Sequence, residues 1–171
     1  MKEIADKTGL SLGAFYHHFK SKEQLFLEIA DYYFKELMRD DFSQFSQESL
    51  WQFLNDYIAN LLGKMEISIY EGKENEVNSY MLIFDALKIL PIFKERILAH
   101  KEKELEIWMK ILKAAKTKGE IKPKMSDGQI ARFFMYSREG LGIRLLMEGN
   151  IASMGEEMRN LWMEYYAQIK G

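Results

Sequence analysis

The sequence predicts an all-α protein, and two observations lead to this prediction. The 171 residues include only two prolines, Pro91 and Pro123, and strand-like alternation of apolar and polar residues is nearly missing. Apolar residues instead recur at intervals of three and four, the spacing that places them on one face of a helix. Separated by glycine, proline and polar turns, these runs predict about eight helices.

Three helices are expected near the N-terminus. Residues 1–8 carry an apolar face, and Gly9 suits the end of this helix because glycine enters the left-handed conformation at low cost. Ser11 can cap the second helix. On that helix the side chains expected to point inward are Leu12, Phe15 and Phe19. Ser21 can cap a third helix over residues 22–38. Helix, tight glycine turn and second helix form a helix-turn-helix layout.

The longest apolar run predicts a helix over residues 50–69. Ser49 and Gln52 form a capping box at its start, and the polar stretch 71–76 ends it. Its apolar face consists of Leu50, Phe53, Leu54, Tyr57, Ile58, Leu61, Leu62, Met65 and Ile69.

Two further helices are predicted next. One begins at about Val77 and ends near Leu87, and Pro91 either closes it or opens the following helix. The following helix begins at about Ile92 and ends near Gly119, which is expected to be left-handed.

Two capped helices complete the chain. Ser126 and Gln129 form a capping box for a helix that reaches about residue 148. Ser153 with Glu156 is expected to cap the last helix.

The helix over residues 126–148 is apolar on two sides. Phe134 and Leu141 lie on one side, whereas Tyr136 and Ile143 lie on the other. Burial on two sides favours an isologous contact between the last two helices of two subunits. The residues expected at this homodimer interface are Phe134, Leu141, Gly142, Leu145, Leu161, Trp162 and Tyr165. The alternative is a central helix in a monomeric bundle.

The composition excludes several classes of site. Without cysteine the chain has no disulfide, thiolate metal site or cysteine nucleophile, and charged residues interrupt every apolar run short of a membrane span. We therefore expect a cytoplasmic protein. The net charge is −2, yet residues 1–22 carry four lysines against one Glu and one Asp, which is +2 and leaves −4 for the remainder. A basic end on an acidic body suits a nucleic-acid contact confined to that end.

The outward face of the second helix has a chemistry that suits double-stranded DNA. Small residues let the backbone approach the major groove, and hydroxyl, imidazole and ammonium groups can donate hydrogen bonds to phosphates. The residues expected to contact DNA are Ser11, Gly13, Ala14, Tyr16, His17, His18 and Lys22. Alternatively, the two histidines are solvated surface residues. A metal site is not expected, because adjacent positions do not share a helix face and only His100 remains to join them.

The segment "IADKTGLSLGAFYHHFKSKEQLFLEI", residues 4–29, resembles the DNA-binding signature of the TetR family of bacterial transcriptional regulators. The matching positions are Ile4, Ala5, Gly9, Ser11, Gly13, Tyr16, His18, Phe19 and Lys22. Residues 119–149 resemble more weakly the C-terminal dimerisation region of the family. The family has one more helix before the Ile-Ala helix, which this chain lacks, so we expect that the natural product begins upstream of Met1.

The resemblance implies a ligand-responsive repressor that binds operator DNA as a homodimer. Residues 1–41 would form the DNA-binding part, without the first helix, and residues 42–171 the ligand-binding and dimerisation domain. The effector is expected to be an apolar or aromatic small molecule, since Met and aromatic residues are abundant in the chain. The candidate pocket residues are Tyr57, Met81, Phe84, Trp108, Met109 and Phe133. Each of them is alternatively an ordinary core residue.

Two rival functions remain. An enzyme is not expected, because no set of nucleophile, base and orienting residue stands out, and no cofactor is expected either. The other rival is a helical ligand-binding or dimerising protein that no longer binds DNA because the first helix is absent.

Overall fold

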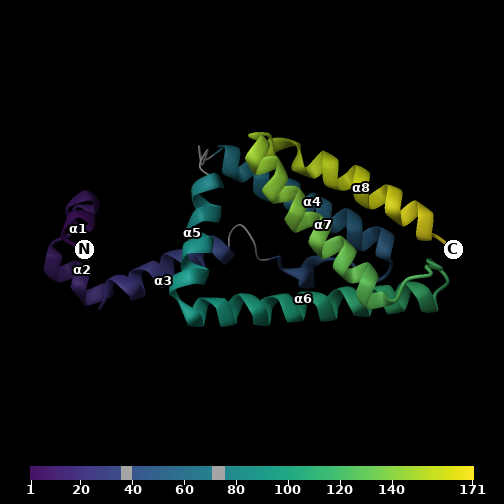
Figure 1. Ribbon diagram of the computed structural model, residues 1–171, viewed down its shortest axis with the longest axis horizontal. Helices are drawn as coiled ribbons and strands as arrows, with labels where there is room; N and C mark the ends of the chain where they lie inside the picture. Colours follow the sequence, from purple (N-terminus) through teal and green to yellow (C-terminus); the bar gives the residue numbers. More distant parts are fainter. Residues whose placement is uncertain (36–39, 71–75) are drawn as a thin grey trace. The chain divides into compact units, whose positions relative to one another are not determined.

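Eight α-helices make up most of the structure. The computed structural model describes residues 1–35, 40–70 and 76–171, without the side chains of residues 65–70 and 76–79. In chain order the helices are α1 (Lys2–Thr8), α2 (Leu12–His18), α3 (Lys22–Tyr33), α4 (Leu50–Tyr70), α5 (Glu76–Ile89), α6 (Pro91–Thr117), α7 (Asp127–Glu148) and α8 (Met154–Ile169) (Figure 1). Two 3₁₀ segments, η2 (Phe42–Gln44) and η3 (Ile151–Ser153), join them.

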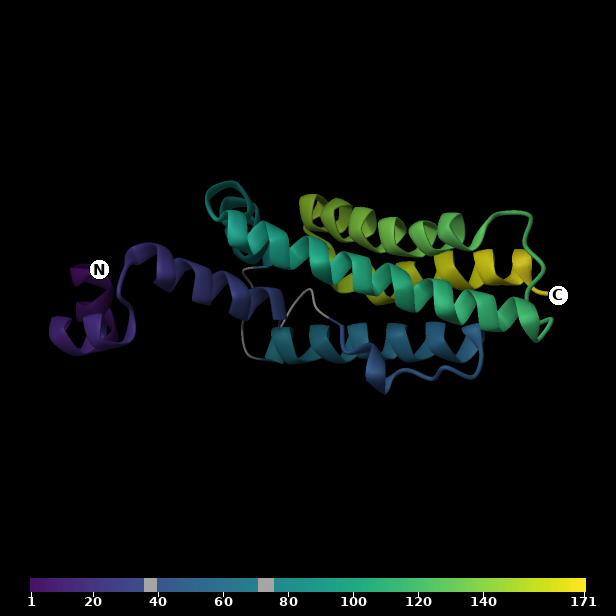
Figure 2. The same cartoon turned by 90° about the horizontal axis from the view of Figure 1, so that it is seen from below.

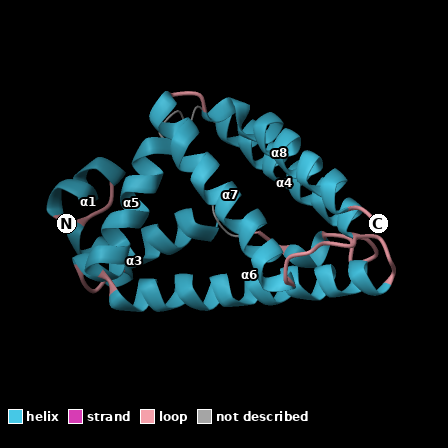
Figure 3. Cartoon of the chain, turned by 45° about the vertical axis from the view of Figure 1, so that its right-hand side comes forward, coloured by secondary structure: helices cyan, strands magenta, loops and turns pink. Residues whose placement is uncertain are grey.

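The all-α prediction is confirmed. Within the described ranges there is no strand, and the single antiparallel bridge pairs Ile121 with Lys170 (Figure 3). None of the helices described is both long enough and apolar enough to cross a membrane.

Most helix ends follow the local signals in the sequence. Gly9 and Gly119 adopt φ values of 71° and 74°, the left-handed conformation that glycine tolerates. The Ser11 hydroxyl accepts a hydrogen bond from the Ala14 amide at 3.2 Å. Ser126 forms the expected capping box with its N3 residue at the start of α7.

One helix start differs from the expectation, and another has a partner that was not expected. Ser153 makes no side-chain cap, because η3 precedes α8 directly and the Ser153 hydroxyl donates instead to the carbonyl oxygen of Asn150 at 3.0 Å. Ser49 accepts a hydrogen bond from the Gln52 amide at 3.1 Å as predicted. In addition, the Glu120 carboxylate accepts from the Leu50 amide at 2.9 Å, a contact across 70 residues that local pattern cannot reveal.

Some predictions concern residues outside the description. The expected continuation of the third helix to Met38 lies there in part, since α3 ends at Tyr33. Of the predicted polar turn 71–76, residues 71–75 also lie outside the described residues, whereas Glu76 begins α5. The side chains of Met65, Ile69 and Val77 lie outside the description too.

The chain divides into two compact units. Unit 1 comprises Met1–Arg39 and Asn78–Leu98, and unit 2 comprises Asp40–Val77 and Ala99–Gly171. The functional boundary expected after residue 41 stays a prediction. The two units do not correspond to a single division of the chain, because α5 and the start of α6 belong to unit 1 together with the N-terminal helices.

Unit 1 contains two small apolar clusters. The first consists of the buried residues Ala5, Phe15 and Leu25, with Met1 and Phe19 packed against them. The second consists of Ala30, Phe34, Ile83, Ala86, Leu90 and Phe93. An ion pair between Asp31 and Arg96 joins α3 to the first turns of α6. Leu12, expected to point inward, is 42% exposed, so that prediction is wrong.

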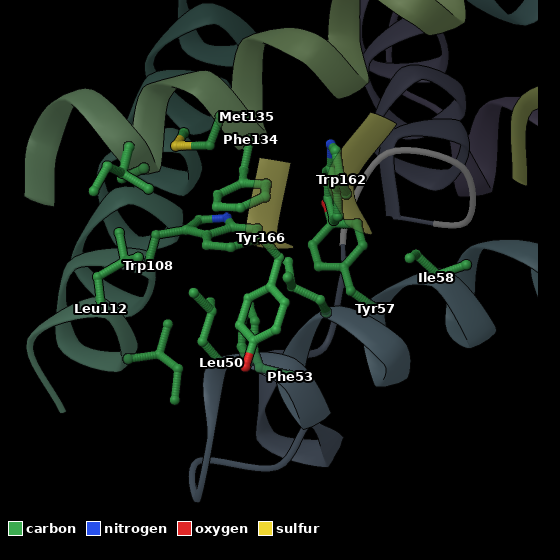
Figure 4. Packing of buried hydrophobic residues seen from close by; sticks show 14 of the residues in the cluster. Leu50, Phe53, Tyr57, Ile58, Trp108, Leu112, Phe134, Met135, Trp162 and Tyr166 are labelled. Atoms are coloured by element: carbon green, nitrogen blue, oxygen red, sulfur yellow. The ribbon is translucent and has the colours of Figure 1, made fainter. Parts of the chain in front are cut away.

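Unit 2 is built around an aromatic core. Helices α4, α7 and α8 and the later turns of α6 run alongside one another in Figure 2, and all four contribute to the same cluster. Trp108 stacks on Phe134 with ring centroids 4.9 Å apart, and the ring of Trp162 lies nearly perpendicular to both, at interplanar angles of 86° and 79° (Figure 4). Each fully buried aromatic side chain contributes about 2–3 kcal/mol by removal from water, so this cluster holds the four helices together.

The start of α8 packs closely on α4 at a glycine. A Cβ added to Gly155 would clash with the side chain of Leu62. We therefore expect Gly155→Ala to lower the free energy of unfolding by about 1–3 kcal/mol through overpacking. Gly63→Ala, on α4 with no atom within 4 Å of the added carbon, is the matched control and should leave stability unchanged or slightly raised. Urea unfolding measures both, and equal effects would contradict the close packing.

Candidate functional site

The expected DNA-contacting residues form one exposed surface at the N-terminus. The seven residues Ser11, Gly13, Ala14, Tyr16, His17, His18 and Lys22 are all exposed in the structure. Phe15, only 2% exposed, fixes the opposite side of α2 in the first cluster of unit 1. Helices α1 and α2 pack against each other, so α1 supports α2 on the side opposite the exposed face (Figure 1).

Proton donors surround the small residues of this surface. The rings of His17 and His18 meet edge to face with centroids 5.6 Å apart. Lys22 is the first residue of α3, where unsatisfied backbone amides add to its positive charge. Gly13 presents no side chain, and a Cβ there would have no atom within 4 Å. This surface can therefore approach an anionic backbone closely.

The layout of α1, turn and α2 with this exposed face defines a helix-turn-helix DNA-binding segment. Residues 1–29 match the family described as bacterial regulatory proteins, tetR family, which confirms the resemblance found in the sequence. The N-terminal segment is accordingly similar to that family, which is consistent with a TetR-family regulator. No curated protein and no solved structure was found to match the chain.

The expected pocket residues are divided between the two units. Tyr57 and Trp108 are fully buried neighbours in unit 2, with ring centroids 5.8 Å apart. Phe133 is half-buried and packs on Tyr165. The remaining three are exposed by 42–58%: Met81 and Phe84, which belong to unit 1, and Met109 in unit 2.

The expected interface residues also separate into two groups. The buried members, which pack within unit 2 itself, are Phe134, Gly142, Leu145 and Trp162. Those that retain exposed surface are Leu141, Leu161 and Tyr165. The indole nitrogen of Trp162 donates to the Ser137 hydroxyl at 2.9 Å, so Trp162 serves the packing of α7 against α8.

A buried carboxylate in unit 2 was not anticipated from the sequence. Asp40 is 4% exposed and lies among donors from α4 and α7. Its Oδ2 accepts from the Tyr57 hydroxyl at 2.8 Å and lies 3.2 Å from the Arg138 guanidinium. Its Oδ1 accepts from the Asn60 amide and the Lys64 ammonium, each at 3.0 Å.

The charges of this cluster decide its protonation. Burial by itself would raise the pKa of Asp40, but the positive charges of Arg138 and Lys64 outweigh it, so the pKa is lowered and the carboxyl is ionised near neutral pH. Burial raises the pKa of Tyr57 well above its usual value, so this phenol keeps its proton and donates to Asp40.

One signal for this cluster existed in the sequence. Tyr57, Asn60 and Lys64 follow the i, i+3, i+7 spacing of one helix face, within a run that is otherwise apolar. Arg138 is buried, whereas its neighbour Glu139 is exposed and pairs with Lys101 at 2.6 Å. Nothing local indicated Asp40, because its partners lie 17 to 98 residues away.

The lowered pKa predicts a pH-dependent loss of stability. Asp40→Asn should lower the free energy of unfolding by about 3 kcal/mol at pH 7, because the substitution removes a buried ionic partner. Since the folded-state pKa lies below the unfolded one, about 3.9, the advantage of the wild type is complete above that value and shrinks as the pH falls below it. Urea unfolding of both proteins from pH 7 to pH 3 measures this difference. A difference that stays constant would contradict the assignment.

Proposed function

We propose that this protein is a transcriptional repressor of the TetR type, which binds operator DNA as a homodimer and releases it when a small molecule binds. One observation carries the proposal: residues 1–29 match the family and present a continuous exposed face on α2 above the buried Phe15. Major-groove recognition by a helix-turn-helix needs this kind of exposed second helix.

Contacts to DNA phosphates follow from the chemistry of that face. Gly13 and Ala14 let the helix lie close to the groove, while Tyr16, His17 and His18 donate hydrogen bonds at its edges. Lys22 combines its own charge with the amides at the start of α3. Phosphate contacts of this kind position the protein without specifying the base sequence.

The proposed dimer uses apolar surface that remains exposed on α7 and α8. Tyr136, Ile143 and Met147 on α7 are 60%, 40% and 78% exposed, and Leu161 on α8 is 42% exposed. Gly140, between them on α7, would permit close approach of a second helix. To bind two half-sites, such a dimer needs its two recognition helices about 34–36 Å apart, or at a larger spacing that keeps the groove phase.

A ligand can release DNA if it binds one conformation of the protein more tightly than another. A ligand that binds more tightly to the form with unsuitable spacing lowers the DNA affinity by that same factor. Among the candidate pocket residues, the neighbours Tyr57 and Trp108 are best placed to sense a ligand in the core of unit 2.

The phosphate contacts predict how binding depends on salt. Tyr16→Phe and Lys22→Ala should weaken binding to all DNA sequences similarly, and Lys22→Ala should reduce the slope of log K against log[salt] by about one. Lys103→Ala, which removes an equally exposed charge from α6, is the control and should leave binding unchanged. Gel shifts on the DNA upstream of the gene measure this. A changed sequence preference with an unaltered slope would refute the phosphate assignment.

The proposed dimer predicts the effect of charge on α7. Ile143→Glu and Met147→Glu should convert the dimer to a monomer without unfolding it, since each places two like charges near the twofold contact. Leu98→Glu, at an apolar position that is 53% exposed on α6, is the matched control and should leave the dimer intact. Sedimentation equilibrium measures the mass, and a wild-type monomer or unaffected variants would exclude this interface.

A further inference from the structure

We propose that Tyr57, Asn60, Lys64 and Arg138 form a carboxylate-binding site, which Asp40 occupies in the free protein and a carboxylic-acid effector takes over. The inference rests on the ligand response proposed above and names the chemical class of that ligand. It concerns unit 2 alone, because all five residues belong to that unit.

The donors match a carboxylate oxygen by oxygen. The Tyr57 hydroxyl and the Arg138 guanidinium lie at 2.8 and 3.2 Å from Oδ2, while the Asn60 amide and the Lys64 ammonium each lie at 3.0 Å from Oδ1. A carboxylate offers about four lone-pair sites, and here each oxygen meets two donors. Any carboxylate placed at this point would find the same four groups.

The charge around the site favours an anion. Lys64 and Arg138 both form ion pairs with the one carboxylate of Asp40. The nearby acid Glu104 pairs with Lys101 at 2.9 Å. Two cations directed at one carboxylate make the four donors a site for a negative group rather than for a neutral one.

The surroundings of the site are aromatic, and the segment that carries Asp40 is aromatic too. Phe42 and Phe45 pack on Tyr57 with centroids 5.9 and 5.5 Å away, while Trp108 and Trp162 contact the same ring at 5.8 and 5.1 Å. Asp40 and these two phenylalanines thus present a carboxylate together with benzene rings. A free aromatic carboxylic acid has the same chemistry.

A second polar group lies close to the site. The indole nitrogen of Trp108 is buried and has no hydrogen-bond partner among the described residues. A buried donor without a hydrogen-bond partner costs free energy, so a ligand that supplies an acceptor to it would bind more tightly. The ring of Trp108 contacts Tyr57 directly and would therefore report on exchange at the site.

The position of Asp40 in the chain connects this exchange with DNA binding. Asp40 is the first residue of unit 2, and the chain before it leads back to α3, whose first residue is Lys22. An effector that displaces Asp40 breaks the contacts that hold the first residue of unit 2 against α4 and α7. Because Asp40 competes as a tethered ligand, at an effective concentration in the millimolar range, its removal should tighten binding of a free acid about tenfold or more.

The test compares Asp40→Ala with the wild type in sodium benzoate and sodium formate, against sodium chloride at equal ionic strength. We expect both carboxylates to raise the unfolding temperature of Asp40→Ala, and benzoate to bind it at least tenfold more tightly than the wild type, by tryptophan fluorescence. Asp41→Ala, which removes the neighbouring exposed carboxylate and with it the cap of η2, should bind both carboxylates as the wild type does. No difference between the carboxylates and chloride would overturn the inference.

A second variant does not depend on the folding of Asp40→Ala. Lys64→Gln keeps Asp40, and it should abolish the fluorescence response to benzoate that the wild type shows at millimolar concentration. Rescue of Asp40→Ala by formate without any benzoate response of the wild type would overturn the effector role.

DNA binding is measured separately, so the two proposals fail in different ways. If carboxylates bind the protein but the wild type binds no DNA, the site stands and the repressor does not. If the wild type binds DNA but the carboxylate experiments fail, the repressor stands and this site does not.

Discussion

The buried charge of Asp40 is the constraint on which the arrangement of unit 2 depends. A carboxylate that is 4% exposed must find partners for both oxygens, and α4 and α7 supply four donors. These partners fix α4 against α7 at the polar end of a core otherwise made of aromatic rings. The same requirement gives the core a site where charge and aromatic surface meet, which is the chemistry that a small organic acid needs.

The N-terminal segment depends on much less packing. Ala5, Phe15 and Leu25 form a small cluster, and the exposed face of α2 is a direct consequence of turning Phe15 inward. Leu10, Leu12 and Ile4 remain 38–43% exposed beside it. Because so small a core contributes little stability, DNA contact and folding of this segment are expected to support one another.

Predictions from the sequence were correct where the interactions that determine the local structure lie within about four residues of one another. Gly9, Ser11 and Ser126 act through hydrogen bonds or backbone angles within four residues, and all three behave as expected. The cap predicted at Ser153 is absent, because in η3 the Ser153 hydroxyl donates to the carbonyl oxygen of Asn150 instead. The prediction that Leu12 points inward is wrong, because a period of 3.6 identifies the apolar face of a helix but not whether other residues pack against that face.

The sequence by itself determined the helical class, the order of the helices and the helix-turn-helix segment, because helix propensity, caps and the fixed spacing of that segment are local properties. Only the tertiary structure decided that Phe134 and Trp162 are buried within the chain while Ile143 and Met147 stay exposed. It likewise decided that Asp40 meets Arg138, 98 residues later. Contacts of that range depend on how helices pack, which no local pattern encodes.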